Sequence, residues 1–259
     1  MRNQDKENTV TKLVSIFLGS FLLLTCAVRA AESPAVVEGF ACNFLEGQGM
    51  AELQTATDNF NAALANLDSE DVANLRAFLW VPYRSNTSYD VIWMSNHANL
   101  NAMGRFTSAI EADAAATAAV VAFDDVVDCD SAISLSEQIY AGEGPPVTDP
   151  PALLESYRCN LHDGKTIADA RAAATAWSAH VGNIASYGSA IAFMRTPLIS
   201  GFDSDLSYLI VHNSVEEFAA RNTDYINSDG VDAIGDGFNA VHTCRGGLFM
   251  SNRVVPPPE

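Results

Sequence analysis

Two histidines stand at matching places in the two halves of this sequence, and imidazole is the side chain best suited to proton transfer near neutral pH. His97 follows the apolar segment 91–96, and His212 follows the similar segment 206–211, at an offset of 115 residues. A neutral imidazole there can act as a general base or bind a metal ion. We take both as the candidate catalytic residues. The alternative is a structural role, in which each ring caps the next helix or hydrogen-bonds a carbonyl at a strand end.

A second set of paired residues could line a binding site. Side chains alternate along a strand, so Cys159 should face the helices, while Asn160 and its counterpart Asn43 should face a partner sheet. Strands expected farther along offer further paired positions on the same inward faces. The alternatives are amides that tie down backbone groups and aromatic residues that are plain core. The candidate ligand-binding residues are Asn43, Asn160, Trp80, Arg195, Trp93 and Tyr208.

The stretch CNLHDGKT (159–166) looks like a phosphate-binding loop because it contains Gly-Lys-Thr. Such a loop needs the longer pattern GxxxxGK[ST], and the upstream glycine is absent here. The matching stretch CNFLEGQG (42–49) lacks the Lys-Thr pair as well. We interpret the stretch as a strand-to-helix connection with a turn at Gly164, in which Thr166 caps the helix and Asp169 completes a capping box.

Several signatures of enzymes and metal proteins are missing from the sequence. It has no GxSxG, which carries the nucleophile of α/β-hydrolases, no HExxH zinc motif and no twelve-residue calcium loop. The stretch 224–232 is interpreted as a solvated turn, with weak calcium binding as the alternative. No two cysteines have CxxC spacing. We therefore predict no metal site.

The N-terminus has the pattern of a secretory signal peptide. Residues 1–12 are polar and basic, an apolar run follows at 13–24, and small residues fit cleavage after Ala30 or Ala31. The apolar run is shorter than the roughly 20 residues of a membrane span. A lipoprotein acylated at Cys26 is the alternative. We expect residues 1–31 to be removed and the mature protein to be secreted or periplasmic, with no membrane contact.

The chain is strongly acidic. It has 32 Asp and Glu residues against 14 Lys and Arg, a formal charge of −18, and loss of the leader removes four basic and two acidic residues to give −20. Such a surface repels phosphate backbones, so we expect no nucleic-acid partner. With 48% hydrophobic residues the chain can still bury a large core.

The sequence contains one unit written twice. An offset of 117 aligns the stretches that contain Cys42 and Cys159, and an offset of 115 aligns later residues, including Cys129 with Cys244. A Gly/Pro-rich segment, AGEGPPVTDPP, separates the two copies. The expected organisation is a signal peptide (1–31), repeat 1 (32–140), a linker (141–151), repeat 2 (152–255) and a tail (256–259).

Each copy alternates strand and helix patterns in the order βαββαβ, with helices expected near 99–118 and 214–227 among others. This is the ferredoxin-like unit, whose antiparallel sheet runs 4-1-3-2. The first and last strands are then neighbours, and each carries a cysteine. Four cysteines remain after leader removal, and an even count in an exported chain predicts disulfides. We predict the bridges Cys42–Cys129 and Cys159–Cys244.

Two ferredoxin-like units in one chain resemble the dimeric α+β barrel superfamily in its single-chain form. The resemblance covers nearly all of the expected mature chain in element order. It implies an α+β fold with the two units packed sheet to sheet around a cavity. That superfamily includes cofactor-free monooxygenases, haem-degrading enzymes, chlorite dismutases and stress proteins, and fold does not select among them. The repeated phrase of Cys-Asn, an acid and Gly is also similar to one in secreted proteins of aquatic bacteria, which implies no activity.

Three functions fit these observations. The first is an exported protein that binds a small apolar or amphipathic molecule between its sheets and needs no cofactor. The second is a cofactor-free or haem-dependent monooxygenase-like enzyme that uses His97 or His212 with Asn43 or Asn160. The third is an interaction module with an acidic docking face. The first accounts best for the paired aromatic positions and the missing catalytic signatures. The oligomeric state stays open.

Overall fold

The chain runs through strands and helices in nearly the same order in its two halves. The computed structural model describes residues 34–85, 87–144, 151–200 and 203–255. The first half comprises β1 (Ala35–Phe44), α1 (Met50–Leu64), α2 (Glu70–Ala73), β2 (Arg76–Arg84), β3 (Val91–His97), α3 (Leu100–Ala112), α4 (Ala114–Val121) and β4 (Val127–Ala141). The second half comprises β5 (Ala152–Leu161), α5 (Ile167–Val181), the short 3₁₀ helix η1 (Ala185–Tyr187), β6 (Ile191–Ser200), β7 (Leu206–His212), α6 (Val215–Ile226), α7 (Val231–Asn239) and β8 (His242–Val255).

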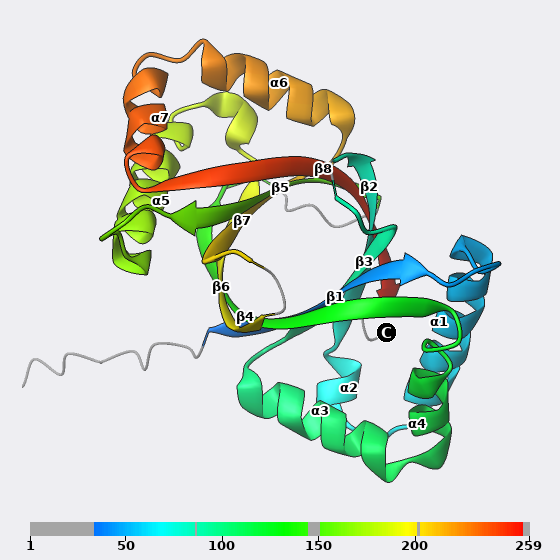
Figure 1. Cartoon of the computed structure of the whole chain (residues 1–259). Helices are drawn as coiled ribbons and strands as arrows, with labels where there is room; N and C mark the ends of the chain where they lie inside the picture. Colours follow the sequence, from blue (N-terminus) through cyan, green and yellow to red (C-terminus); the bar gives the residue numbers. More distant parts are fainter. Residues whose placement is uncertain (1–33, 86, 145–150, 201–202, 256–259) are drawn as a thin grey trace, which may run out of the picture. The chain divides into compact units, whose positions relative to one another are not determined.

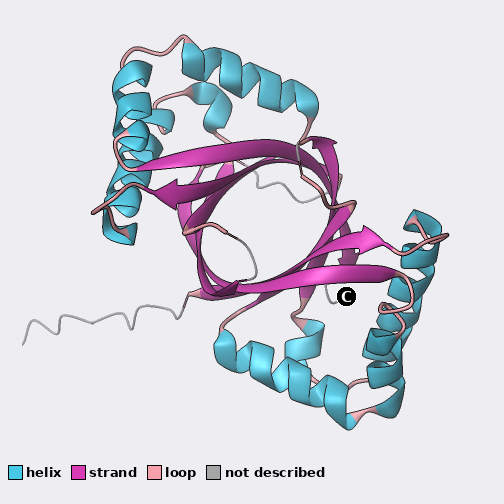
Figure 2. Cartoon of the chain, viewed as in Figure 1, coloured by secondary structure: helices cyan, strands magenta, loops and turns pink. Residues whose placement is uncertain are grey.

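The eight strands form one closed barrel in the order β1-β3-β2-β8-β5-β7-β6-β4. Each half contributes four antiparallel strands in the order 4-1-3-2. The halves were expected to pack sheet against sheet. They also hydrogen-bond at both edges, where β2 pairs with β8 and β4 pairs with β6. Closure satisfies the backbone groups that open edges would leave unpaired. The helices lie outside the barrel in two groups on opposite sides (Figures 1 and 2).

Alternation along the strands gives the barrel an inner and an outer face. In β1, Val37 and Ala41 face the lumen, whereas Glu38 and Phe40 face the helices. Apolar clusters lie between the barrel and the helices in each half. A separate cluster that includes Trp80 lies inside the barrel. A side chain's position along its strand therefore decides whether it can reach the lumen.

The helical segments differ in detail from the expected ones. The helix expected at 99–118 is divided, because Asp113 ends α3 and its carboxylate accepts a hydrogen bond from the Ala116 backbone N–H at 2.8 Å, which starts α4. The stretch 224–232, interpreted as a solvated turn, contains the end of α6 and the start of α7. Gly230 makes the turn between them with φ +87°. The sequence analysis did not predict α7.

The cysteines pair as the predicted strand order requires. Cys42 lies opposite Cys129 on the β1–β4 pair and Cys159 opposite Cys244 on the β5–β8 pair, and both pairs are bonded. The bridges span 87 and 85 residues. Closing loops of that length stabilises a fold by about 4 kcal/mol in the chain-entropy view.

The stretch 159–166 is a strand-to-helix connection, as predicted. Gly164 takes φ +74° in the turn, and Thr166 and Asp169 form a complete capping box at the start of α5. The expected signal peptide lies outside the described residues, and residues 145–150 of the expected linker do as well. Within the described residues, no helix is long and apolar enough to cross a membrane.

Candidate ligand-binding site in the barrel lumen

A cavity of about 560 Å³ occupies the barrel lumen, and every strand contributes to its lining. Its walls combine apolar side chains such as Phe249 with hydroxyl groups such as Ser134, Ser156 and Ser207. Ligand pockets in proteins typically measure roughly 300–1,000 Å³. The lumen is therefore large enough for a small organic molecule.

Trp80 of β2 and Arg195 of β6 meet across the lumen. The Arg195 guanidinium carbon lies 5.2 Å from the centroid of the Trp80 ring, a cation–π contact. Both residues are buried, and Arg195 Nε has no hydrogen-bond partner within the described residues. Burial lowers the pKa of Arg195 to about 10, so the group remains charged at neutral pH. The site thus holds a buried cation whose Nε–H finds no acceptor among the described residues.

A row of cationic residues crosses the lumen wall of the second half. Arg195 pairs with Ser207 of β7, Ser207 pairs with Arg158 of β5, and Arg158 pairs with Arg245 of β8. All four residues line the cavity. Neighbouring strands lie about 4.8 Å apart, and like charges directly opposite each other are unfavourable. This wall therefore gathers three positive charges in a protein whose formal charge is −18.

The corresponding row in the first half is mostly apolar. Trp80 pairs with Ile92 of β3, Ile92 with Ala41 of β1, and Ala41 with Asp130 of β4. Asp130 is exposed and accepts a hydrogen bond from the Tyr89 hydroxyl at 2.9 Å. None of the described residues that line the cavity is a histidine, aspartate or glutamate. The lumen is thus amphipathic, with one apolar wall and one basic wall.

The other predicted ligand-binding residues lie outside the lumen. Asn43 and Asn160 are exposed near the ends of β1 and β5 and line no part of it. Trp93 and Tyr208 were expected on inward faces, and this expectation is wrong. Trp93 pairs with the outward Phe40, and Tyr208 donates a hydrogen bond to the Ala170 carbonyl of α5 at 3.3 Å. Both rings pack against the helices because each lies one residue out of phase with the lumen-facing positions of its strand.

His97 is buried at the end of β3 and does not line the lumen. Its ring packs against Phe106 of α3 with 5.3 Å between ring centroids. Burial lowers the pKa of His97 to about 4, although the nearby Asp71 carboxylate opposes this effect. Within the described residues, its Nε2 atom has no hydrogen-bond partner. The ring is neutral at physiological pH but lies away from the cavity.

His212 is fully buried and belongs to a polar network of the second half. Arg221 of α6 donates to His212 Nδ1 at 2.9 Å, so the ring proton is on Nε2, which lies 3.4 Å from Glu155 Oε2. Arg221 also binds Glu217, and the Tyr157 hydroxyl donates to Glu155. Burial and the adjacent Glu155 carboxylate raise the pKa of Tyr157. Both nitrogens of His212 are engaged in this structural network.

Haem does not fit either histidine. Iron ligation needs a free imidazole nitrogen that faces a cavity large enough for the macrocycle. His212 uses both nitrogens within the protein, and His97 lines neither the lumen nor the cavity between the barrel and the helices of the first half. The two rings also belong to different halves of the barrel. We therefore derive no chemistry through haem at these positions.

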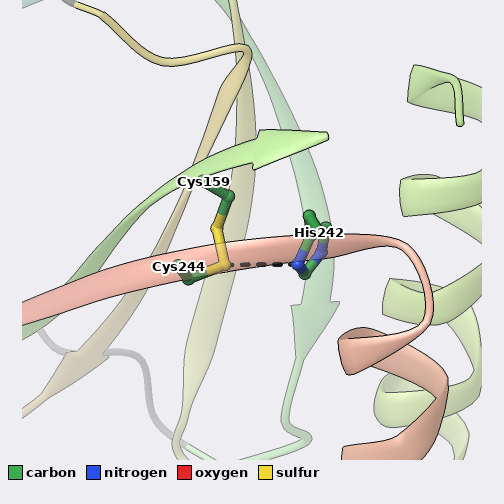
Figure 3. Close-up of side chains that lie close together, drawn as sticks. All are labelled: Cys159, His242 and Cys244. Carbon is green, nitrogen blue, oxygen red and sulfur yellow. Dashed lines mark hydrogen bonds between the residues drawn. A yellow bond between two sulfur atoms is a disulfide. The ribbon is translucent and has the colours of Figure 1, made fainter. Parts of the chain in front are cut away.

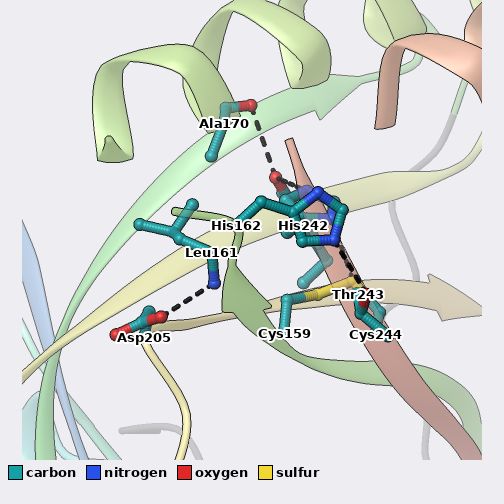
Figure 4. Close-up of a disulfide and its surroundings, with 9 residues drawn as sticks. Cys159, Leu161, His162, Ala170, Asp205, His242, Thr243 and Cys244 are labelled. Carbon is teal, nitrogen blue, oxygen red and sulfur yellow. Dashed lines mark hydrogen bonds between the residues drawn. A yellow bond between two sulfur atoms is a disulfide. The ribbon is translucent and has the colours of Figure 1, made fainter. Parts of the chain in front are cut away.

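Three potential metal ligands lie together beside the second disulfide. Donor atoms of Cys159, His242 and Cys244 lie within 4.8 Å of one another (Figure 3). The two sulfur atoms are bonded to each other and so lack the thiolate charge that binds metals. His242 Nδ1 lies 3.3 Å from Cys244 Sγ, and its Nε2 lies 3.0 Å from the Tyr208 hydroxyl (Figure 4). In the oxidised protein this cluster packs the start of β8 against β5.

The basic row and the Arg221 network were not predicted from the sequence. The predicted Cys159–Cys244 bridge already sets Arg158 opposite Arg245, since each arginine is next to a bridged cysteine on paired strands. The sequence therefore contained an indication that Arg158 and Arg245 lie opposite each other. The burial of Arg221 depends on how α6 packs, and no sequence pattern indicated it.

Comparisons with known proteins identify the fold. No protein-family model and no curated protein matches the sequence. A proposed monooxygenase from Fusobacterium nucleatum has a TM-score of 0.56 at 9% identity, covering 85% of this chain and 94% of that one. A second, from Lactobacillus acidophilus, has a TM-score of 0.55 at 11% identity, covering 86% and 95%. A chlorite dismutase variant from Candidatus Nitrospira defluvii has a TM-score of 0.51 at 9% identity, covering 86% and 93%. At such identities the likeness shows the fold alone: an α+β barrel like those of these chlorite dismutases and proposed monooxygenases.

Proposed function

We propose that this chain is an exported tandem of two ferredoxin-like units whose shared lumen binds a small amphipathic anion. The observation that carries the proposal is the contrast between the two walls, since a row of three arginines faces a row that is apolar at Trp80, Ile92 and Ala41 and ends in Asp130. The repeated strand order and the two bridges at matching positions support the tandem organisation. Disulfides of this kind are typical of exported proteins.

The electrostatics of the basic wall favour an anionic head group. Arg158 and Arg245, both exposed, lie directly opposite each other, and an anion between them would be attracted by both. Guanidinium groups bind carboxylate, sulfate or phosphate oxygens in a bidentate manner. Trp80, Phe249 and Val37 would cover an apolar tail. The ligand class is thus a carboxylate or related anion on an apolar body that fits about 560 Å³.

Enzymatic turnover is the second candidate, because two neighbours in structure are proposed monooxygenases. The lumen offers little support for acid–base chemistry, since none of its described lining residues is a histidine or a carboxylate. His97 and His212 lie outside it. Binding without turnover therefore accounts better for the residues that are present.

The test is a calorimetric titration with decanoate at concentrations below those at which it forms micelles. Decanol, which has the same chain length, is the uncharged probe. We expect Arg195→Met and Arg245→Gln each to raise the Kd for decanoate about tenfold, which is about 1.4 kcal/mol. Lys165→Met removes one positive charge from an exposed turn and should change nothing. Decanol should bind all four proteins equally.

Two results would overturn the proposal. One is equal decanoate affinity in the wild type and both lumen variants, and the other is no decanoate binding at millimolar concentration. Native mass spectrometry of the protein from its own kind of host then separates binding from turnover. A co-purifying anion that keeps its mass under oxygen supports a binding protein, whereas a changed mass or oxygen uptake supports an enzyme.

A further inference from the structure

A second cavity, of about 670 Å³, lies on the outer face of the first half. It is partly open and lies between the barrel and the helices α1, α3 and α4, which cover this side of the barrel in Figure 1. Its walls are rich in aromatic rings: Phe40 and Trp93 come from the strands, Phe60 from α1, Phe106 from α3, and Phe123 follows α4. The rings of Phe60, Trp93 and Phe123 contact one another edge to face. We call this the helix-side pocket.

A half-buried carboxyl group, Glu38 of β1, lies in the helix-side pocket. Within the described residues its side chain makes no hydrogen bond or ion pair. Burial raises the pKa of Glu38, as expected for an acid among apolar groups. Asp124 and Asp128, both exposed, also line the pocket. Within the described residues, the Glu38 carboxyl group therefore has no cationic group beside it.

In the second half, the acid that matches Glu38 has polar partners. Glu155, which the offset of 117 aligns with Glu38, accepts hydrogen bonds from Tyr157 and from His212, and His212 is held in turn by Arg221. The residues that the offsets align with Tyr157 and Arg221 are Phe40 and Phe106. Both therefore carry a phenyl ring in place of a donor. The first half thus keeps the acid and the histidine, Glu38 and His97, but has aromatic rings where the second half has the tyrosine hydroxyl and the guanidinium.

We propose that the helix-side pocket binds an apolar ammonium ligand, with Glu38 as its counter-ion and the aromatic rings as its walls. Ammonium groups are attracted to the faces of aromatic rings, and sets of such rings recognise alkylated ammonium ions. A carboxylate within an apolar pocket adds a charge-assisted hydrogen bond from a primary amine. The acidic surface of the protein raises the local concentration of cations. This site is separate from the lumen and does not rest on the function proposed for it.

The test uses decylammonium and decanol as probes of equal chain length, titrated by calorimetry into the disulfide-bonded protein at low ionic strength. Glu38→Gln keeps the shape of the side chain and removes its charge. We expect Glu38→Gln to raise the Kd for decylammonium at least tenfold and to leave that for decanol unchanged. Glu52→Gln removes an exposed charge from α1 and is the matched control, with no change expected for either probe.

The lumen variant Arg245→Gln separates the two sites. It should bind decylammonium as the wild type does, whatever it does to decanoate. Equal decylammonium affinity in the wild type and Glu38→Gln overturns the proposal, as does an equal loss in Glu52→Gln. Circular dichroism of Glu38→Gln checks the fold, which should be retained because the substitution removes a charge from an apolar site.

Discussion

At the scale of the residue, His97 makes the stability of this fold depend on pH. Its pKa is lowered to about 4 in the folded chain, whereas histidine in an unfolded chain has a pKa of about 6.5. Between these values the unfolded chain binds a proton that the folded chain does not. The free energy of unfolding therefore falls as the pH falls from about 6.5 to 4. The difference corresponds to at most about 3 kcal/mol.

Substitution of His97 should remove this dependence. We expect urea unfolding to show that the wild type loses about 2 kcal/mol more than His97→Gln between pH 7.5 and 4.5. His162→Gln is the control, because His162 is exposed and should leave the pH dependence as in the wild type. If the free energy of unfolding changes equally with pH in the wild type and in His97→Gln, burial of His97 has no part in the acid sensitivity.

At the scale of the element, Arg221 fixes α6 to the rest of the second half. Its guanidinium donates to the Ser186 carbonyl of η1 at 2.9 Å and to the Val211 carbonyl of β7 at 3.0 Å, as well as to His212 and Glu217. The side chain is fully buried, and burial lowers its pKa. Removing it leaves several buried groups without a donor, which is costly in a region closed to water.

We expect Arg221→Met to lower the free energy of unfolding by about 3–5 kcal/mol. The control is Arg105→Met, which breaks an exposed ion pair with Asp71 and should cost less than about 1 kcal/mol. Chemical denaturation of the three proteins at pH 7.5 measures both changes. A loss below 1 kcal/mol in Arg221→Met would mean that α6 is held by its apolar contacts alone.

The order of the helices and strands could be predicted from the local sequence pattern, whereas the residues at which they begin and end could not. Strand and helix periodicity gave the βαββαβ order, from which the strand order and both disulfides follow. The division at Asp113 and the added helix α7 depend on single caps and turns, which an averaged pattern does not resolve. Of the residues expected on inward faces, Trp80 and Arg195 do line the lumen. Trp93 and Tyr208 were misplaced because a one-residue error in phase moves a side chain to the other face.

At the scale of the whole molecule, the two halves depend on each other because the barrel closes between them. In an isolated half, the edges that normally form the β2–β8 and β4–β6 pairs would have no partner. Exposed edges of this kind pair with other chains. The lumen also draws one wall from each half, so neither half alone contains the amphipathic site.

Charge should decide which halves pair. Two copies of the second half would place two rows of three arginines around one lumen, which like-charge repulsion disfavours, whereas two copies of the first half would make a lumen without a basic wall. We expect oxidised fragments 33–144 and 151–259 to self-associate weakly when alone and to form a 1:1 complex when mixed, measured by sedimentation velocity. Only the mixture of the two fragments should bind decanoate. The control is a full-length chain cut between the two halves, which likewise lacks the covalent link. Monomeric fragments as stable as the whole chain would mean that each half folds by itself and that closure adds little, because the disulfides and the helix-facing cores would then suffice.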